Sequence, residues 1–273
     1  MTHFVKLLSI GIVSFLIFGL NFSNFKTNPT NENSGKNIFA VGEDLIYEVK
    51  YTFIKIGEIR IKTLRKFTKD GLEIFETRAY IDSYDRLPFV DLHSIYNSQV
   101  SEKFLSEMFI GLDKHNIGWR FTKYDFDYKK KSIFVQKGFK ENWKVDFEEY
   151  VPLNAELQDG LSLFFFARGN TRQNKTYDIP TYLNESTTLT TINFYKKPEQ
   201  IKIDALDYDV DCVKIDGLVR FTGIFGLTGN FEGYFSNDEA SVPIKATMKV
   251  ILGNINIELK KWDRDDWQPP RKS

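Results

Sequence analysis

Cysteine and histidine are scarce in this sequence of 273 residues, and its charges cancel. The single cysteine, Cys212, excludes an internal disulfide bond and a thiolate metal cluster. The three histidines show neither His-x-His nor His-x-x-x-His spacing, so no zinc or iron ligand pattern is visible. The 37 basic and 37 acidic side chains give no net charge, which removes the long-range attraction that a general nucleic-acid binder needs. We therefore expect no metal, no cofactor and no nucleic-acid partner.

Sequence signatures of common enzymes are also missing. There is no G-x-S-x-G elbow, no G-x-x-x-x-G-K-[ST] loop and no strand-linked G-x-G-x-x-G turn. Asp207, Asp209 and Asp211 resemble the opening of a calcium loop. However, Cys212 replaces the turn glycine and Leu218 replaces the bidentate glutamate, so we interpret the three carboxylates as a solvated strand face. The sequence nominates no catalytic residue, and we favour a non-enzymatic protein over an enzyme.

The N-terminus has the pattern of a secretory signal. Lys6 precedes a largely apolar, uncharged run of 14 residues from Leu7 to Leu20, which is shorter than the roughly 20 residues of a spanning helix. We expect a signal peptide over residues 1–23 and export to the periplasm or cell envelope. The alternative is an uncleaved anchor, in which case only this segment contacts the membrane. Residues 24–40 are rich in Asn, Thr, Ser and Gly, and we expect a flexible linker there.

Aromatic residues are abundant, at 15% of the chain, and they follow a period of two. Leu45, Tyr47, Val49, Tyr51 and Phe53 alternate with polar residues, which predicts strands with one buried face. Repeated patterns of this kind predict about a dozen strands in a curved, mainly antiparallel sheet that forms a half-open or closed barrel. We expect a single domain over residues 41–262 and a polar tail over 263–273 that leaves the sheet.

Two local patterns interrupt this alternation. Trp119 and Phe121 hold odd positions whereas Tyr124 and Phe126 hold even ones, which predicts a β-bulge between them. The segment 154–169 has apolar residues at helical spacing, and it predicts one short helix near 159–168. In that helix Asp159 is the expected N-cap and Arg168 the expected cation near the C-terminal end, each matched to the helix dipole.

The alternating aromatic residues are the only candidates for a binding site. We expect seven of them to face inward: Tyr47, Tyr51, Phe53, Trp119, Phe121, Trp143 and Phe147. Ordinary core packing is one interpretation of this set. The functional interpretation is an apolar pocket enclosed by the curved sheet, of the kind in which small barrels hold lipid-like ligands.

Three blocks of the sequence form a set that keeps its order along the chain. The first contains Gly42, Glu43, Leu45, Tyr47 and Gly57; the second Gln158, Asp159, Ser162, Phe165 and Arg168; the third Ser236, Asp238, Pro243, Gly253 and Leu259. Together they resemble a bacterial exported family, the domain of unknown function 3108. The resemblance implies a signal peptide, a periplasmic or cell-surface location and a β-rich fold. It implies no activity.

Two hypotheses for function follow from these features. The first is a non-enzymatic envelope protein whose sheet binds an apolar or amphipathic, lipid-like small molecule. The alternative is an assembly or scaffold protein that docks an envelope protein partner through an exposed edge or aromatic surface. A hydrolase is a third hypothesis, and it requires a cleft in which carboxylates converge.

Overall fold

The computed structural model describes residues 37–85, 87, 90–220, 229–250 and 253–272. Within these residues it contains one antiparallel sheet of 14 strands and one α-helix, which confirms the mainly β fold expected from the sequence. The expected signal peptide (1–23) and most of the expected linker lie outside the described residues. The strands are β1 (Asp44–Tyr51), β2 (Ile54–Lys69), β3 (Leu72–Ser83), β4 (His93–Ser101), β5 (Ser106–His115), β6 (Gly118–Asp127), β7 (Ser132–Phe139), β8 (Lys144–Pro152), β9 (Lys175–Leu183), β10 (Ser186–Ile201), β11 (Val210–Val219), β12 (Gly229–Ser236), β13 (Pro243–Val250) and β14 (Gly253–Asp263), and the helix is α1 (Gly160–Gly169).

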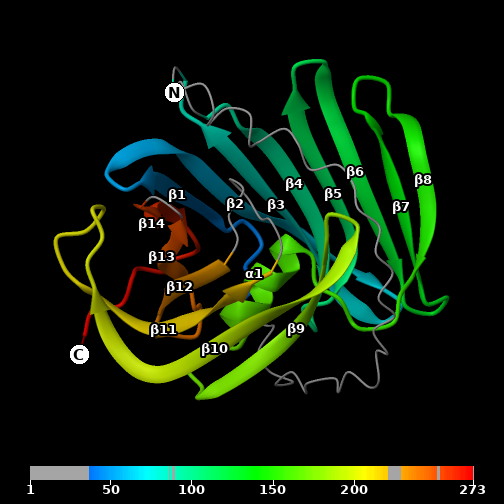
Figure 1. Ribbon diagram of the computed structural model, residues 1–273. Helices are drawn as coiled ribbons and strands as arrows, with labels where there is room; N and C mark the ends of the chain where they lie inside the picture. The colour runs from blue at the N-terminus through cyan, green and yellow to red at the C-terminus, as the bar shows by residue number, and fades with distance from the viewer. Residues whose placement is uncertain (1–36, 86, 88–89, 221–228, 251–252, 273) are drawn as a thin grey trace.

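The sheet is a long meander that bends but does not close. Its strand order is β8-β7-β6-β5-β4-β3-β2-β1-β14-β13-β12-β11-β10-β9, so β8 and β9 are its two edges. Only the β1–β14 pair joins strands distant in sequence. The sheet curves around α1, and the β9–β10 hairpin turns towards the concave side of the strands near the other edge (Figure 1). The half-open form of the expected barrel is therefore the one observed.

Alternating apolar residues set the inward face of each strand. In β1, Leu45 and Val49 are fully buried and Tyr47 is almost so. Leu45 lies opposite Ile61 and Tyr47 opposite Ile59 in β2, so the pairing places apolar side chains together on one side of the sheet.

The bulge predicted between Phe121 and Tyr124 is wrong. β6 pairs with both neighbours in unbroken register, so these two residues lie on opposite faces of the sheet. Both are buried nonetheless, at 4% and 3% exposure. Phe121 is on the outer face, where the ring of Trp143 lies 5.3 Å from it, centroid to centroid. The Phe121 ring is covered on the convex side of the sheet, and an apolar residue there has the same sequence pattern as one in the concave core.

Helix α1 begins at a complete capping box. The Asp159 carboxylate accepts hydrogen bonds from the backbone N–H groups of Leu161 and Ser162, at 2.7 and 3.0 Å, and the Ser162 hydroxyl accepts one from the Asp159 N–H. Arg168 lies in the last turn. At Gly169 an added Cβ would lie 2.2 Å from the Phe104 ring, so only glycine permits this approach. The short helix expected near 159–168 is confirmed.

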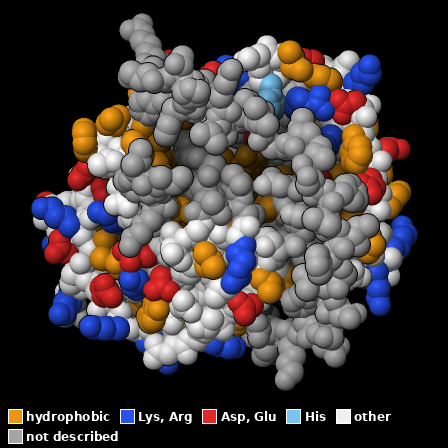
Figure 2. All heavy atoms as spheres, in the orientation of Figure 1, with side chains coloured by type: hydrophobic (Ala, Val, Ile, Leu, Met, Phe, Trp, Pro, Cys, Tyr) orange, Lys and Arg blue, Asp and Glu red, His pale blue; other side chains and the backbone are white. Residues whose placement is uncertain are grey.

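The interior contains two hydrophobic clusters. The larger one fills the space between α1 and the strands on both sides of β1, and it includes Leu45, Phe75, Phe165 and Phe194. The smaller one lies on the concave side of the strands near the β8 edge and consists of Phe109, Tyr124, Phe126, Ile133, Val135, Leu153, Leu157 and Tyr182. Hydrophobic side chains are also visible inside a hollow near the middle of the face shown in Figure 2.

The prediction of a flexible linker over residues 24–40 is wrong at the C-terminal end of that segment. Ile38 and Phe39 are 3% and 5% exposed. The Phe39 ring stacks on Phe75 at 4.2 Å and on Phe165 at 4.6 Å between centroids. The polar composition of the segment hid these two apolar residues, which belong to the core.

The expected polar tail, 263–273, does not leave the sheet. The Trp267 indole N–H donates to the Asp238 carboxylate at 2.7 Å, and the carbonyl of Pro270 accepts from the Asp211 N–H at 2.8 Å. The Arg271 guanidinium lies 3.9 Å from the centroid of the Tyr208 ring. Prolines lack the N–H but keep the carbonyl, so this segment still binds the start of β11.

Among the described residues, no helix combines the length and hydropathy needed to cross a membrane.

Candidate functional site

A set of polar side chains lies on the concave side of β4–β7, and we call it the inner polar face: Tyr96, Asp113, Arg120, Thr122 and Lys137. Strand pairing places them side by side, because Asp113 lies opposite Arg120, and Thr122 lies opposite Lys137. They share this side with Tyr124 of the smaller cluster, two residues along from Thr122. All five are half-buried.

Hydrogen bonds hold Tyr96, Asp113 and Arg120 of the inner polar face in place. The Ser94 hydroxyl donates to Asp113 Oδ1 at 2.5 Å, and the Tyr96 hydroxyl donates to the same oxygen at 3.2 Å. Burial, and then the neighbouring Asp113 carboxylate, raise the pKa of Tyr96, so its hydroxyl stays protonated and remains a donor. Arg120 donates to both carboxylate oxygens of Asp146, at 3.0 and 2.7 Å. Its guanidinium lies 4.4 Å from the centroid of the Phe139 ring.

Side chains from the opposite end of the sheet complete the face. Glu185, in the turn between β9 and β10, accepts a hydrogen bond from the Tyr124 hydroxyl at 2.7 Å and pairs with Lys137 at 2.6 Å. The ring of Tyr182 packs edge-on against Tyr124 and Phe126. Burial and the Glu185 carboxylate raise the pKa of Tyr124, so this hydroxyl is also a permanent donor. The two ends of the sheet thus meet through side chains.

The inner polar face is only partly covered by the helix. α1 packs against β3, β4 and β9. Further along the concave side, Arg120 and Lys137 each keep 31% of their side-chain surface exposed, and Phe147 is 43% exposed. This part of the sheet combines aromatic rings with paired charges in contact with solvent.

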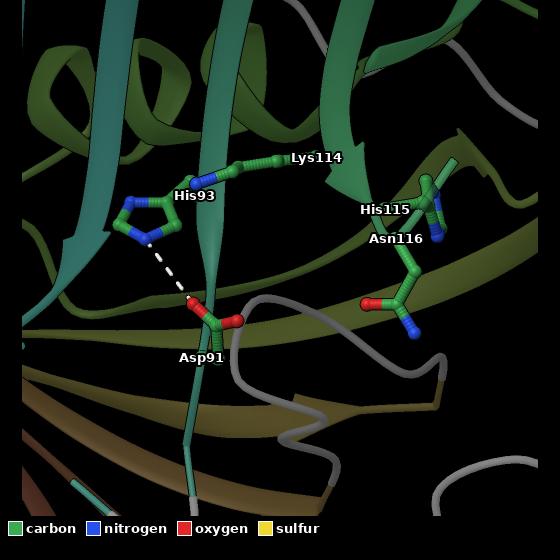
Figure 3. Close-up of a pocket in the computed structure, with 5 residues that line it drawn as sticks. All are labelled: Asp91, His93, Lys114, His115 and Asn116. Atoms are coloured by element: carbon green, nitrogen blue, oxygen red, sulfur yellow. Dashed lines mark ion pairs between the residues drawn. The ribbon is translucent and has the colours of Figure 1, made fainter. Parts of the chain in front are cut away.

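A second, smaller hollow of about 340 Å³ lies at the rim of the sheet and is lined by Asp91, His93, Lys114, His115 and Asn116 (Figure 3). His93 is held between two carboxylates: Nδ1 lies 2.8 Å from Asp82, and Nε2 lies 3.2 Å from Asp91. Both ring nitrogens of His93 therefore face carboxylate oxygens. Nowhere in the described part of the chain do three or more His, Cys, Asp or Glu side chains gather in a way that could hold a metal ion.

A buried group of charges joins both ends of the domain to α1. Arg168 is fully buried and forms a two-point ion pair with Glu43, at 2.7 and 2.9 Å. Arg264 reaches the same carboxylate at 2.5 Å and also donates to the backbone carbonyl of Ile38. Burial opposes ionisation of Glu43, but the two guanidinium charges outweigh it and hold the pKa of Glu43 below its ordinary value.

Asp159, the other charge expected at a helix end, is also fully buried. Besides the two backbone N–H groups of the cap, the hydroxyls of Ser98 and Ser106 donate to it at 2.6 and 2.8 Å. Burial raises the pKa of Asp159 in spite of these four donors. Asp159 and Arg168 lie at opposite ends of α1 with separate partners, and they do not form a common cleft.

The structure does not bring the seven predicted pocket residues together. Tyr47 is buried in the larger cluster, and Tyr51 packs against that cluster. Phe147 belongs to β8, where Lys137 lies 5.9 Å from its ring centroid beside the inner polar face.

The inward orientation expected for the other four is wrong. Phe53 is in the β1–β2 turn and 83% exposed. Trp143 is 53% exposed in the β7–β8 turn, and it covers Phe121 from outside. Trp119 shares the outer side with Phe121, two positions along the same strand, and the Lys140 ammonium lies 5.2 Å from the centroid of its ring. Period-two alternation identifies two faces of a strand but does not say which one is concave.

Sequence reasoning also missed the inner polar face. A signal was present: Asp113 and Arg120 are opposite charges placed symmetrically around the β5–β6 turn, which is the spacing of a cross-strand pair in a hairpin. Glu185 could not be found in this way, because its partners Tyr124 and Lys137 are brought to it only by the curvature of the sheet.

Comparison with known proteins identifies a family and a fold. A family model described as "Protein of unknown function (DUF3108)" matches residues 46–260, which confirms the resemblance seen in three short blocks. No curated protein matches the sequence. The crystal structure of a beta-barrel-like protein of domain of unknown function DUF1849 from Brucella abortus is similar over 84% of this chain and 99% of that chain, with a TM-score of 0.50 and 10% identity. The hypothetical protein CT021 from Chlamydia trachomatis covers 88% of this chain and 96% of its own, with a TM-score of 0.33 and 11% identity.

Proposed function

This chain belongs to the DUF3108 family of proteins of unknown function, and we propose that it is a non-enzymatic protein of the bacterial cell envelope that binds an amphipathic, lipid-like molecule on the inner polar face. The observation that supports this function is the half-buried mixture of aromatic rings and paired charges on the concave side of β4–β7, beyond the contacts of α1. The partly exposed rings of Phe139 and Phe147 supply an apolar floor, and Tyr96, Asp113 and Arg120 supply hydrogen-bonding groups beside it.

The charges of the inner polar face indicate the kind of head group. Arg120 is paired with Asp146, and Lys137 with Glu185, so neither cation needs an anionic ligand for charge balance. A neutral or zwitterionic head group that accepts and donates hydrogen bonds suits these paired charges better than a strongly anionic one. The acyl or other apolar part would lie along the rings of the floor.

The cellular location is part of the same proposal. It depends on Lys6 and the apolar run from Leu7 to Leu20. Fusion of residues 1–40 to a reporter that is active only after export tests it. Reporter activity is expected, and its absence would contradict an envelope location without affecting the binding site.

A substitution that fills the inner polar face tests the binding function. Thr122→Trp places an indole between Gly111 and the side chain of Lys137, whereas Lys123→Trp places the same group on the outer side of the same strand. Both positions are half-buried, so the introduced ring meets a similar degree of burial in the two variants. The measurement is native mass spectrometry of protein purified without detergent from the producing cells, with titration of a dansyl-labelled lysophosphatidylcholine, whose head group is zwitterionic, by fluorescence.

We expect a co-purifying amphipathic molecule in the wild-type and Lys123→Trp proteins and at least tenfold weaker probe binding by Thr122→Trp. Wild-type protein that carries no ligand and gives no probe signal would overturn the proposal. Equal probe binding by all three proteins would place the ligand elsewhere.

A further inference from the structure

Strand β8 is an edge of the sheet with unusual exposure. Every residue of β8 except Val151 is exposed. Three of its large apolar side chains are open to solvent: Val145 at 39%, Phe147 at 43% and Tyr150 at 70%. An edge strand of nine residues presents unpaired backbone N–H and C=O groups along its outer side, and these groups can pair with a further strand.

The other edge, β9, is covered. Gln158 forms an isolated bridge with Thr181: its N–H donates to the carbonyl of Pro180 at 3.1 Å, and its carbonyl accepts from the Tyr182 N–H at 2.8 Å. Pro180 itself has no N–H to offer a further strand. In the described part of the chain, no segment pairs with the outer side of β8. Within the described residues, Gln158 thus covers part of the β9 edge, whereas the β8 edge is unpaired.

The charges on β8 indicate what can bind there. Asp146 is neutralised by Arg120. Glu148 and Glu149 are exposed, and neither forms an ion pair with any described residue. We propose that β8 is a docking edge that accepts an extended, basic segment of a partner protein by strand addition. Lys or Arg side chains of that segment would lie beside Glu148 and Glu149, and apolar side chains beside Phe147 and Tyr150.

A second copy of this chain fits β8 less well. Antiparallel pairing of two β8 strands about their midpoint would place Glu148 directly opposite Glu148 of the other copy. Like charges in that position destabilise a strand pair. This inference concerns the backbone edge of β8, which adjoins the inner polar face at Phe147, and it holds whether or not that face binds a ligand.

Two synthetic peptides of equal length test the proposal: the Lys–Val peptide repeats Val-Lys-Lys-Val, which matches the order Phe147-Glu148-Glu149-Tyr150, and the Glu–Val peptide repeats Val-Glu-Glu-Val. Fluorescence anisotropy measures their binding to the full chain, and hydrogen–deuterium exchange locates the bound peptide. The Lys–Val peptide is expected to bind, to weaken as salt is raised, and to slow exchange of the β8 amides. The Glu–Val peptide is expected not to bind.

Charge reversal supplies the matched control. The double variant Glu148→Lys/Glu149→Lys should bind the Lys–Val peptide at least tenfold more weakly and should bind the Glu–Val peptide instead. Glu102→Lys/Glu156→Lys has the same net charge change away from β8 and should behave as wild type. Circular dichroism tests whether both double variants fold. If one of them does not fold, the location of the peptide is decided by the hydrogen–deuterium exchange pattern of the wild-type chain.

Three outcomes would overturn the proposal. Equal loss of binding in both double variants would show attraction to net charge alone. Protection at strands other than β8 would place the peptide elsewhere. Concentration-dependent dimers with protected β8 amides would assign the edge to a second copy.

Discussion

At the scale of single residues, the most constrained group is the buried carboxylate of Glu43. It faces the guanidinium groups of Arg168 and Arg264, and all three side chains are at most 9% exposed. Burying these charges costs free energy, and their mutual attraction with good geometry offsets it. The three residues come from the start of the domain, the end of α1 and the segment after β14. Their pairing fixes these parts of the chain together.

Replacing Glu43 by glutamine is expected to lower the free energy of unfolding by about 3 kcal/mol, because two buried cations lose their counter-charge. Asp44→Asn, at the next residue, removes the more exposed pair with Arg60 and should cost no more than about 1 kcal/mol. Urea denaturation at pH 7 measures both. Similar small losses in the two variants would show that the buried pair contributes little.

The difference in unfolding free energy between the wild type and Glu43→Gln is expected to depend on pH. The pKa of Glu43 in the folded protein is below its ordinary value of 4.5. Its contribution is therefore complete above that value and is lost as the pH falls through the lower, folded-state pKa. The stability difference between wild type and Glu43→Gln should be largest near neutral pH and should shrink in acid. A difference that grows as the pH falls would contradict the assigned direction.

At the scale of elements, the segment before β1 behaves as part of the core. Phe39 completes a stack of rings with Phe75 of β3 and Phe165 of α1. The centroid of the Phe104 ring lies 5.7 Å from that of Phe39. This segment therefore joins the helix to the sheet, although no hydrogen-bonded element contains it.

Phe39→Ala should reduce the free energy of unfolding by about 3–5 kcal/mol, since it removes a buried ring and leaves a cavity. Asn37→Ala, two residues earlier and exposed, should change it by less than about 0.5 kcal/mol. Thermal or urea unfolding distinguishes them. If Phe39→Ala is as stable as Asn37→Ala, the segment is not part of the folded unit.

At the scale of the whole molecule, the sheet is closed by side chains and not by a backbone ladder. Glu185 accepts from Tyr124 and pairs with Lys137, which joins the β9–β10 turn to β6 and β7. Such a closure leaves two strand edges and an open concave side, whereas a continuous ladder would remove the edges.

Glu185→Ala should loosen this closure and lower stability by about 1–3 kcal/mol, because the Tyr124 hydroxyl loses its acceptor. Spin labels at Lys144→Cys and Thr187→Cys can report the separation of the two ends, since Cys212 is fully buried. A broader and longer distance distribution is expected in Glu185→Ala than in Glu156→Ala. An unchanged distribution would mean that other contacts hold the ends together.

Strand positions were predictable because each strand repeats a local pattern. The alternation expected over Leu45–Phe53 corresponds to β1, and the capped helix was placed almost to the residue. The orientation of the aromatic residues was not predictable, as Phe121 and Trp143 show. Either side of a curved sheet can bury a ring when a neighbouring turn covers it.

The amino-acid sequence by itself determined the mainly β class, the family and the helix with Asp159 at its start, because alternation, turns and caps depend on residues close together in the chain. Only the tertiary structure decided which face is concave, that Glu43 meets both Arg168 and Arg264, and that among the described residues β8 is an unpaired edge while Gln158 pairs with β9. These features depend on how far a long sheet bends and twists, and that curvature brings together residues more than a hundred positions apart.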